Sequence, residues 1–139
     1  MTHSAHTTMR IDHIAIWCED LERMREFYTT YFSCRAGEIY HNPRKQYSSY
    51  FLTFDDGSSR IELMHRTDIT AEPEKRGLMM GLAHISICVG ERREVDSLVE
   101  KLRLDGHRIV GEVRTTGDGY YEAVVEDVEG NLVEITANK

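Results

Sequence analysis

The sequence is poor in cysteine, and its few cysteines do not have the spacing of a disulfide scaffold or a zinc site. Three occur among 139 residues, at positions 18, 34 and 88, and none forms a Cys-x-x-Cys pair. An odd number of cysteines without that spacing argues against a disulfide scaffold or a zinc knuckle. We therefore expect a protein of a reducing compartment, with the cytoplasm as the simplest location.

Long apolar runs and clusters of basic residues are missing as well. No apolar stretch approaches the roughly 18 residues that suggest a membrane span, and residues 1–9, MTHSAHTTM, lack the apolar core of a secretory signal. The formal net charge is −7, whereas a nucleic-acid surface needs concentrated lysine and arginine. We expect no membrane partner and no nucleic acid, and we interpret residues 1–9 as a flexible tail.

What is present is an ordinary globular composition, with 40% hydrophobic and 29% charged residues. Hydrophobic periodicity predicts the same order of elements twice, separated by a linker over 67–81 that contains proline and glycine. The predicted first module, 10–66, has a strand at 11–17, a helix at 21–32 and strands at 36–40, 47–54 and 60–65; the predicted second module, 82–139, has a strand at 82–89, a helix at 91–104 and strands at 108–113, 120–126 and 132–136. Each module is βαβββ, and one module alone does not bury its sheet, so we expect the two to form one α+β domain.

The repeat extends to the residues themselves. IDHIAI in the first half matches LAHISI in the second, which aligns His13 with His84, and RIELM matches LVEIT, which aligns Glu62 with Glu134. Glu62 follows His13 by 49 residues, and Glu134 follows His84 by 50. The two histidines and two glutamates therefore form a set of four in register.

Strand alternation places these four side chains on the polar faces of their strands. Ile14 and Ile16 share one face, which leaves His13 on the other; Glu134 likewise points away from Val133 and Ile135. Buried carboxylates without a counter-charge are costly, and a divalent cation with imidazole and carboxylate ligands removes that cost. The pattern predicts a metal site, and the alternative is two hydrogen-bonded His–Glu pairs that face a solvent-filled cleft.

The chain resembles the vicinal oxygen chelate superfamily, which includes glyoxalase I and the bleomycin- and fosfomycin-resistance proteins. Four segments carry the resemblance, which spans about residues 10–137: IDHIAIWCEDLERMREFYTTYF, RIELM, GLAHISICVG and GYYEAVVEDVEGNLVEIT. Val128 stands where the family's closing segment usually has proline. The resemblance implies two βαβββ modules whose curled mixed sheets form a cup around one divalent metal, with the helices on the outside.

The resemblance also implies a ligand set and a reaction. His13, Glu62, His84 and Glu134 match the His/Glu/His/Glu arrangement of glyoxalase I-type lyases, with Ni, Zn, Co, Mn or Fe(II) as the metal. The implied reaction passes through a metal-held enediolate of a small substrate with adjacent oxygens, with Glu134 as the base and Glu62 as its partner on the opposite face. Two alternatives remain: a metal-dependent dioxygenase of the same superfamily, and a non-catalytic protein that binds a drug or metabolite.

Two positions differ from small glutathione-using relatives. Trp17 stands where those relatives carry arginine, and Arg66 stands where they carry asparagine, so the resemblance does not extend to glutathione as co-substrate. The further candidates for substrate contact are Trp17, Tyr47, Tyr50, Arg60 and Tyr120. Tyr47 and Tyr50 fall on opposite faces of one strand, so at most one of them faces the cup. We expect a homodimer, but the sequence does not decide whether the four ligands come from one chain or from two.

Overall fold

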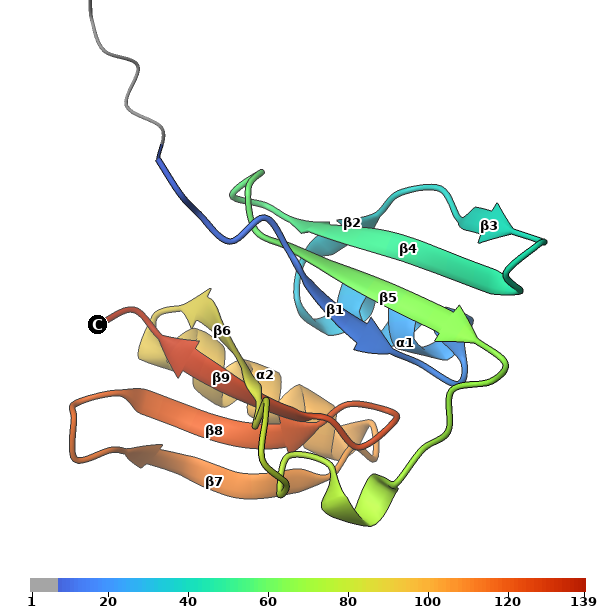
Figure 1. The fold of residues 1–139 in the computed structure, drawn as a ribbon. Helices are drawn as coiled ribbons and strands as arrows, with labels where there is room; N and C mark the ends of the chain where they lie inside the picture. The colour runs from blue at the N-terminus through green and yellow to red at the C-terminus, as the bar shows by residue number, and fades with distance from the viewer. Residues whose placement is uncertain (1–7) are drawn as a thin grey trace, which may run out of the picture.

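The computed structural model describes residues 8–139, and the predicted tail at 1–9 falls mostly outside this range. The chain forms two sheets, each with one helix across one face (Figure 1). The predicted fold class, two βαβββ-type modules of the α+β kind, is confirmed. The two sheets remain separate and do not close into one continuous curved sheet.

The first module has one short strand more than the repeat predicts. Its elements are β1 (Ile14–Trp17), α1 (Leu21–Tyr31), β2 (Cys34–Ala36), β3 (Tyr40–Asn42), β4 (Tyr47–Phe54) and β5 (Arg60–Arg66). The sheet order is β1-β5-β4-β2, with β3 paired to β4, and β1 runs parallel to β5. A single strand at 36–40 is therefore wrong: after Gly37 donates its backbone N–H to Phe51, the chain leaves the ladder and returns as β3.

The second module repeats the arrangement without the extra strand. After a short 3-10 turn, η1 (Pro73–Lys75), come β6 (Ile85–Gly90), α2 (Arg92–Leu104), β7 (Ile109–Thr115), β8 (Tyr121–Glu126) and β9 (Leu132–Ala137). The sheet order is β6-β9-β8-β7, with β6 parallel to β9. β1 and β6 are thus equivalent edge strands, and within the part of the chain that the structure describes each pairs on one side only.

Each helix forms where its sequence supplies an apolar stripe. Asp20 caps α1 by accepting a hydrogen bond from the backbone N–H of Arg23 at 3.1 Å. Met24 and Tyr28 of α1 are fully buried, as are Val95 and Leu102 of α2. The two residues of each pair lie four and seven positions apart, respectively, so they share one face of their helix and pack on the sheet. Neither helix is long and apolar enough for a membrane span, which holds for the described residues 8–139.

The two modules are joined by contacts between α1 and the turn after β8. The buried Tyr28 hydroxyl donates to Asp127 Oδ2 at 2.7 Å, and burial followed by the Asp127 charge raises the pKa of Tyr28. Glu129, two residues further on, accepts hydrogen bonds from the backbone N–H groups of Glu19 and Asp20, both at 2.8 Å. These contacts fix the helix of one module against the sheet of the other.

Candidate metal centre

The first half of the candidate site joins β1 to β5. His13 lies one residue before β1, not within the strand, and the parallel pairing sets Ala15 opposite Glu62. His13 Nε2 is 3.4 Å from Glu62 Oε1, and the edge of the imidazole ring packs on Phe51, whose ring centroid is 4.9 Å away. One nitrogen and one oxygen donor thus lie together at this end of the first sheet.

The second half repeats this geometry on β6 and β9. His84 likewise lies one residue before its strand, and Ser86 is opposite Glu134 in the parallel pair. His84 Nε2 is 3.2 Å from Glu134 Oε2. The sequence repeat is therefore reproduced as two equivalent His–Glu pairs, which we call the first half-site (His13 and Glu62) and the second half-site (His84 and Glu134).

The two half-sites do not meet in one chain. Within residues 8–139, no three histidine, cysteine, aspartate or glutamate side chains gather closely enough to hold a metal ion together. Each half-site supplies one imidazole nitrogen and one carboxylate oxygen, the donors that suit zinc and other first-row divalent metals. A complete four-ligand shell needs one half-site of each kind in contact.

Aromatic and cationic side chains surround the first half-site. The Tyr47 hydroxyl donates to Glu62 Oε2 at 2.9 Å, and burial, followed by this contact with Glu62, raises the pKa of Tyr47. The Tyr47 ring meets the edge of Trp17 with centroids 6.3 Å apart, and the Arg66 guanidinium lies 5.4 Å from the centroid of the Trp17 ring. This face therefore offers an aromatic surface with a cation beside the carboxylate.

Asp12 is a functional candidate that the sequence analysis missed. Its Oδ2 is 2.7 Å from His13 Nδ1 and also accepts a hydrogen bond from Arg60 Nη2 at 2.6 Å. These two contacts, His13 first, lower the pKa of Asp12 to about 2, so the side chain is a carboxylate. The signal was present as an aspartate directly before the histidine, but its partner Arg60 is 48 positions away and only the fold brings it close.

Glu122 is a second missed carboxyl, next to Glu134 on the second sheet. It is 7% exposed, and its Oε2 has no hydrogen-bond partner among the described residues. Burial, and then the nearby carboxyl of Glu134, raises the pKa of Glu122. The β8–β9 register pairs Glu122 with Thr136 and Val124 with Glu134, so both carboxyls lie on the same face of the sheet.

Comparison with known proteins now assigns the family. The family model of the Glyoxalase/Bleomycin resistance protein/Dioxygenase superfamily matches residues 10–135. The chain belongs to this superfamily.

Three relatives show how this member compares with others. The lactoylglutathione lyase of Haemophilus influenzae is 28% identical over 132 residues, which cover 94% of each protein. The trypanothione-dependent glyoxalase I of Leishmania major is 26% identical, with a TM-score of 0.74 over 94% of this chain and 87% of that one. A glyoxalase family protein from Bacillus cereus, at 19% identity, shares the fold with a TM-score of 0.78 over 98% of each chain.

The other residues predicted to contact substrate in this superfamily member occupy different environments. Tyr50 lies on the opposite face of β4 from Tyr47, and its hydroxyl donates to Glu22 of α1, so Tyr50 is outside the candidate site. Arg60 is in β5 and is engaged by Asp12. Tyr120 lies just before β8, with the Lys139 ammonium 4.4 Å from the centroid of its ring.

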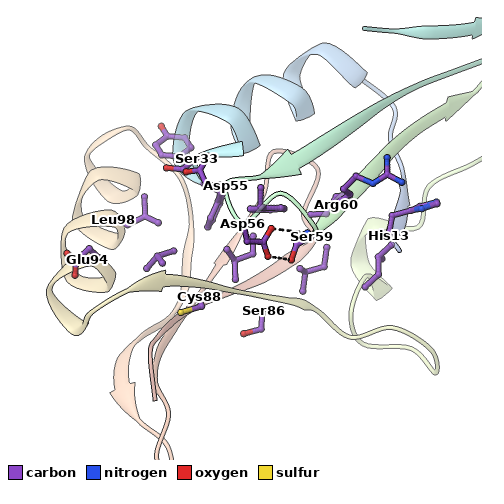
Figure 2. A pocket seen from close by; sticks show the side chains of 18 of the residues that line it. His13, Ser33, Asp55, Asp56, Ser59, Arg60, Ser86, Cys88, Glu94 and Leu98 are labelled. Carbon is purple, nitrogen blue, oxygen red and sulfur yellow. Dashed lines mark hydrogen bonds between the residues drawn. The ribbon is translucent and has the colours of Figure 1, made fainter. Parts of the chain in front are cut away.

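A large cavity lies next to the first half-site and shares His13 with it. Its volume is about 800 Å³, and His13 and Arg60 lie at one end while Glu94 and Leu98 lie at the other (Figure 2). Aliphatic residues of both sheets line it, namely Ile14, Ile61, Ile85 and Ile87. Its lining includes His13 but not Glu62, His84 or Glu134, so the cavity reaches only one of the four candidate ligands.

Proposed function

We propose that this protein is a metal-dependent lyase or isomerase of the glyoxalase I type that acts on a small substrate with adjacent oxygens. The observation that carries the proposal is the pair of equivalent half-sites, with nitrogen-to-oxygen distances of 3.4 Å and 3.2 Å. Family membership and the 28% identity to a lactoylglutathione lyase support the same class.

The residues present fit a divalent cation. Ligand bonds of about 2.1 Å to a common ion place two donor atoms about 3.0 Å apart at a right angle and about 3.4 Å apart at a tetrahedral angle. Both half-sites fall within this range. Nitrogen and oxygen donors suit Ni, Zn, Co, Mn or Fe(II), and the ligands alone do not select among them.

A second copy of the chain completes the site in this proposal. The half-sites lie apart within residues 8–139, and in the same range β1 and β6 each lie at an edge of their sheet with one side unpaired. A homodimer that joins the first half-site of one chain to the second half-site of its partner brings four ligands together and covers these edges. Two such sites form in each dimer by symmetry.

The chain's own carboxylates provide the proton transfer. When bound, the cation acts as a Lewis acid that holds the two substrate oxygens and offsets the negative charge that develops on them. Glu134 is the base that removes a proton from the carbon beside one oxygen, and Glu62 faces the substrate from the opposite side. Return of a proton to the neighbouring carbon completes an isomerisation with no net change in atoms or electrons.

In this proposal, the side chains beside the first half-site determine which substrate binds. Trp17 and Arg66 stand where glutathione-using relatives carry arginine and asparagine. In this chain the Arg66 guanidinium lies over the Trp17 ring instead. An aromatic surface with a guanidinium favours a substrate with a flat or anionic portion. The proposed function therefore does not depend on glutathione as the thiol.

The experiment is metal analysis of the purified protein with turnover measured before and after chelation. We expect about one divalent ion per chain, loss of turnover on chelation and recovery on adding Ni, Zn, Co, Mn or Fe(II). The hemithioacetal of methylglyoxal and glutathione is the first substrate to test, followed by hemithioacetals of other thiols. No bound metal and no effect of the chelator on ligand binding would instead support a non-catalytic binding protein.

Glu134→Gln tests the assignment of the base. The amide keeps an oxygen near His84 but does not accept the substrate proton, so we expect turnover to fall at least a hundredfold while the protein stays folded. Circular dichroism checks the fold, and Glu112→Gln, an exposed carboxylate paired with Arg103 on the second module, is the matched control. Wild-type turnover in Glu134→Gln would contradict the assignment.

A further inference from the structure

A chain of hydrogen bonds lies behind the metal-facing nitrogen of His13. Asp12 Oδ2 is 2.7 Å from His13 Nδ1, and an ionised carboxylate only accepts hydrogen bonds, so Nδ1 carries the proton. When the ring serves as a metal ligand, its lone pair is then on Nε2, which lies 3.4 Å from Glu62 Oε1. The contact between Asp12 and His13 thus leaves Nε2, the nitrogen that faces Glu62, available to a metal.

Asp12 is itself held in place from a distant strand. Arg60 of β5 donates to the same Oδ2 at 2.6 Å, and Arg10 lies 3.3 Å from Oδ1. The Arg60 guanidinium also lies 4.4 Å from the centroid of Phe51, the ring that packs on His13. Arg60 therefore fixes both the carboxylate and the aromatic wall beside the imidazole.

The second half-site lacks this support. Ala83 occupies the position before His84, and no side chain forms a hydrogen bond with His84 Nδ1 within residues 8–139. The His84 side chain is also more exposed, at 41% against 33% for His13. The two half-sites match in their ligands but differ in what orients the histidine.

We propose that Asp12, held by Arg60, is a positioning residue that fixes the tautomer and orientation of His13 and thereby makes the first half-site the preorganised half of the metal centre. The inference rests on the proposed function for its effect on metal binding. A carboxylate that accepts the second N–H of a ligating histidine raises the basicity of the ligand, and removing such a partner costs about 10–100-fold in metal affinity.

The first test measures the tautomer in the metal-free protein, which does not depend on the proposed function. In protein with nitrogen-15 histidine, the long-range proton–nitrogen spectrum distinguishes Nδ1–H from Nε2–H rings. We expect His13 to be Nδ1–H in the wild type and to shift towards Nε2–H in Asp12→Ala, whereas Glu112→Gln leaves it unchanged. An Nδ1–H ring retained in Asp12→Ala overturns the proposal.

The second test titrates Ni²⁺ or Co²⁺ alone into wild-type protein, Asp12→Ala and Asp12→Asn, in competition with a chelator of known affinity. We expect a dissociation constant raised 10–100-fold in Asp12→Ala and less in Asp12→Asn, whose amide oxygen still accepts the Nδ1 hydrogen. Glu112→Gln is again the control. Equal affinity in all four proteins overturns the role of Asp12, while no metal binding by the wild type removes the proposed function and leaves the tautomer result to decide the contact.

Discussion

At the residue scale, the candidate site is defined by carboxyl groups in contrasting environments. Asp12 is half exposed, and its contacts with His13 and then Arg60 lower its pKa, whereas Glu122 is buried with one oxygen unpartnered among residues 8–139. The buried carboxyl is the unfavourable one, because a charge without a partner is costly in the protein interior. Glu122 lies on the same face of the second sheet as Glu134.

Glu122→Gln tests this cost through the pH dependence of stability. Since the pKa of Glu122 is raised in the folded state, the native protein holds a proton that the unfolded chain releases above about pH 4.5, and stability falls as pH rises from there. The amide does not ionise, so we expect the free energy of unfolding at pH 7 to increase by about 1 kcal/mol or more, with little change at pH 4.

Urea unfolding at both pH values, with chelator present and at one protein concentration, measures the effect of Glu122→Gln. Glu126→Gln is the matched control, because Glu126 lies four positions after Glu122 in β8 and pairs with Arg108 at 3.3 Å. A loss of stability at pH 7 in Glu122→Gln would mean that the ionised carboxylate is stabilising after all.

At the element scale, α1 is part of the first module in the sequence but also packs against the second module. Its apolar stripe was predictable from the spacing of Leu21, Met24 and Tyr28, and its start was predictable from Asp20. Two sets of hydrogen bonds were not predictable, because their partners lie about 100 positions away: the bond from Tyr28 to Asp127 and those from the start of the helix to Glu129. Local pattern determines the helix, and the β8–β9 turn determines where it docks.

Tyr28→Phe measures the strength of this docking. The change removes the buried donor to Asp127, although Asn131 still donates to the same oxygen, so we expect a loss of about 1–3 kcal/mol in the free energy of unfolding. Tyr50→Phe is the control, because its hydroxyl also contacts a carboxylate, Glu22, but at an exposed position. Equal losses in the two variants would show that the buried hydrogen bond stabilises the protein no more than the exposed one.

At the scale of the whole molecule, the arrangement of the half-sites predicts how mixed dimers behave. His13→Ala with Glu62→Ala destroys the first half-site, and His84→Ala with Glu134→Ala destroys the second. Each variant alone forms no complete site. A dimer of one chain of each kind carries one intact site, made from the two undamaged halves.

We therefore expect the two double variants to be inactive separately and to recover about half the wild-type turnover, with about one metal ion per dimer, when they are co-expressed with different tags and purified through both. Sedimentation at the assay concentration tests whether the mixed dimer forms. No recovery in a verified mixed dimer would place all four ligands within one chain.

The sequence by itself determined the repeat, the helices, the faces of the strands and the pairing of each histidine with its glutamate. These follow from periodicity and from the parallel pairing of equivalent strands, both of which act within one module. Tertiary structure alone decided that Asp12 meets Arg60, that Glu122 is buried next to Glu134, and that the two half-sites stay apart in one chain. Those contacts depend on how distant strands and whole modules dock, and the local sequence pattern does not determine this docking.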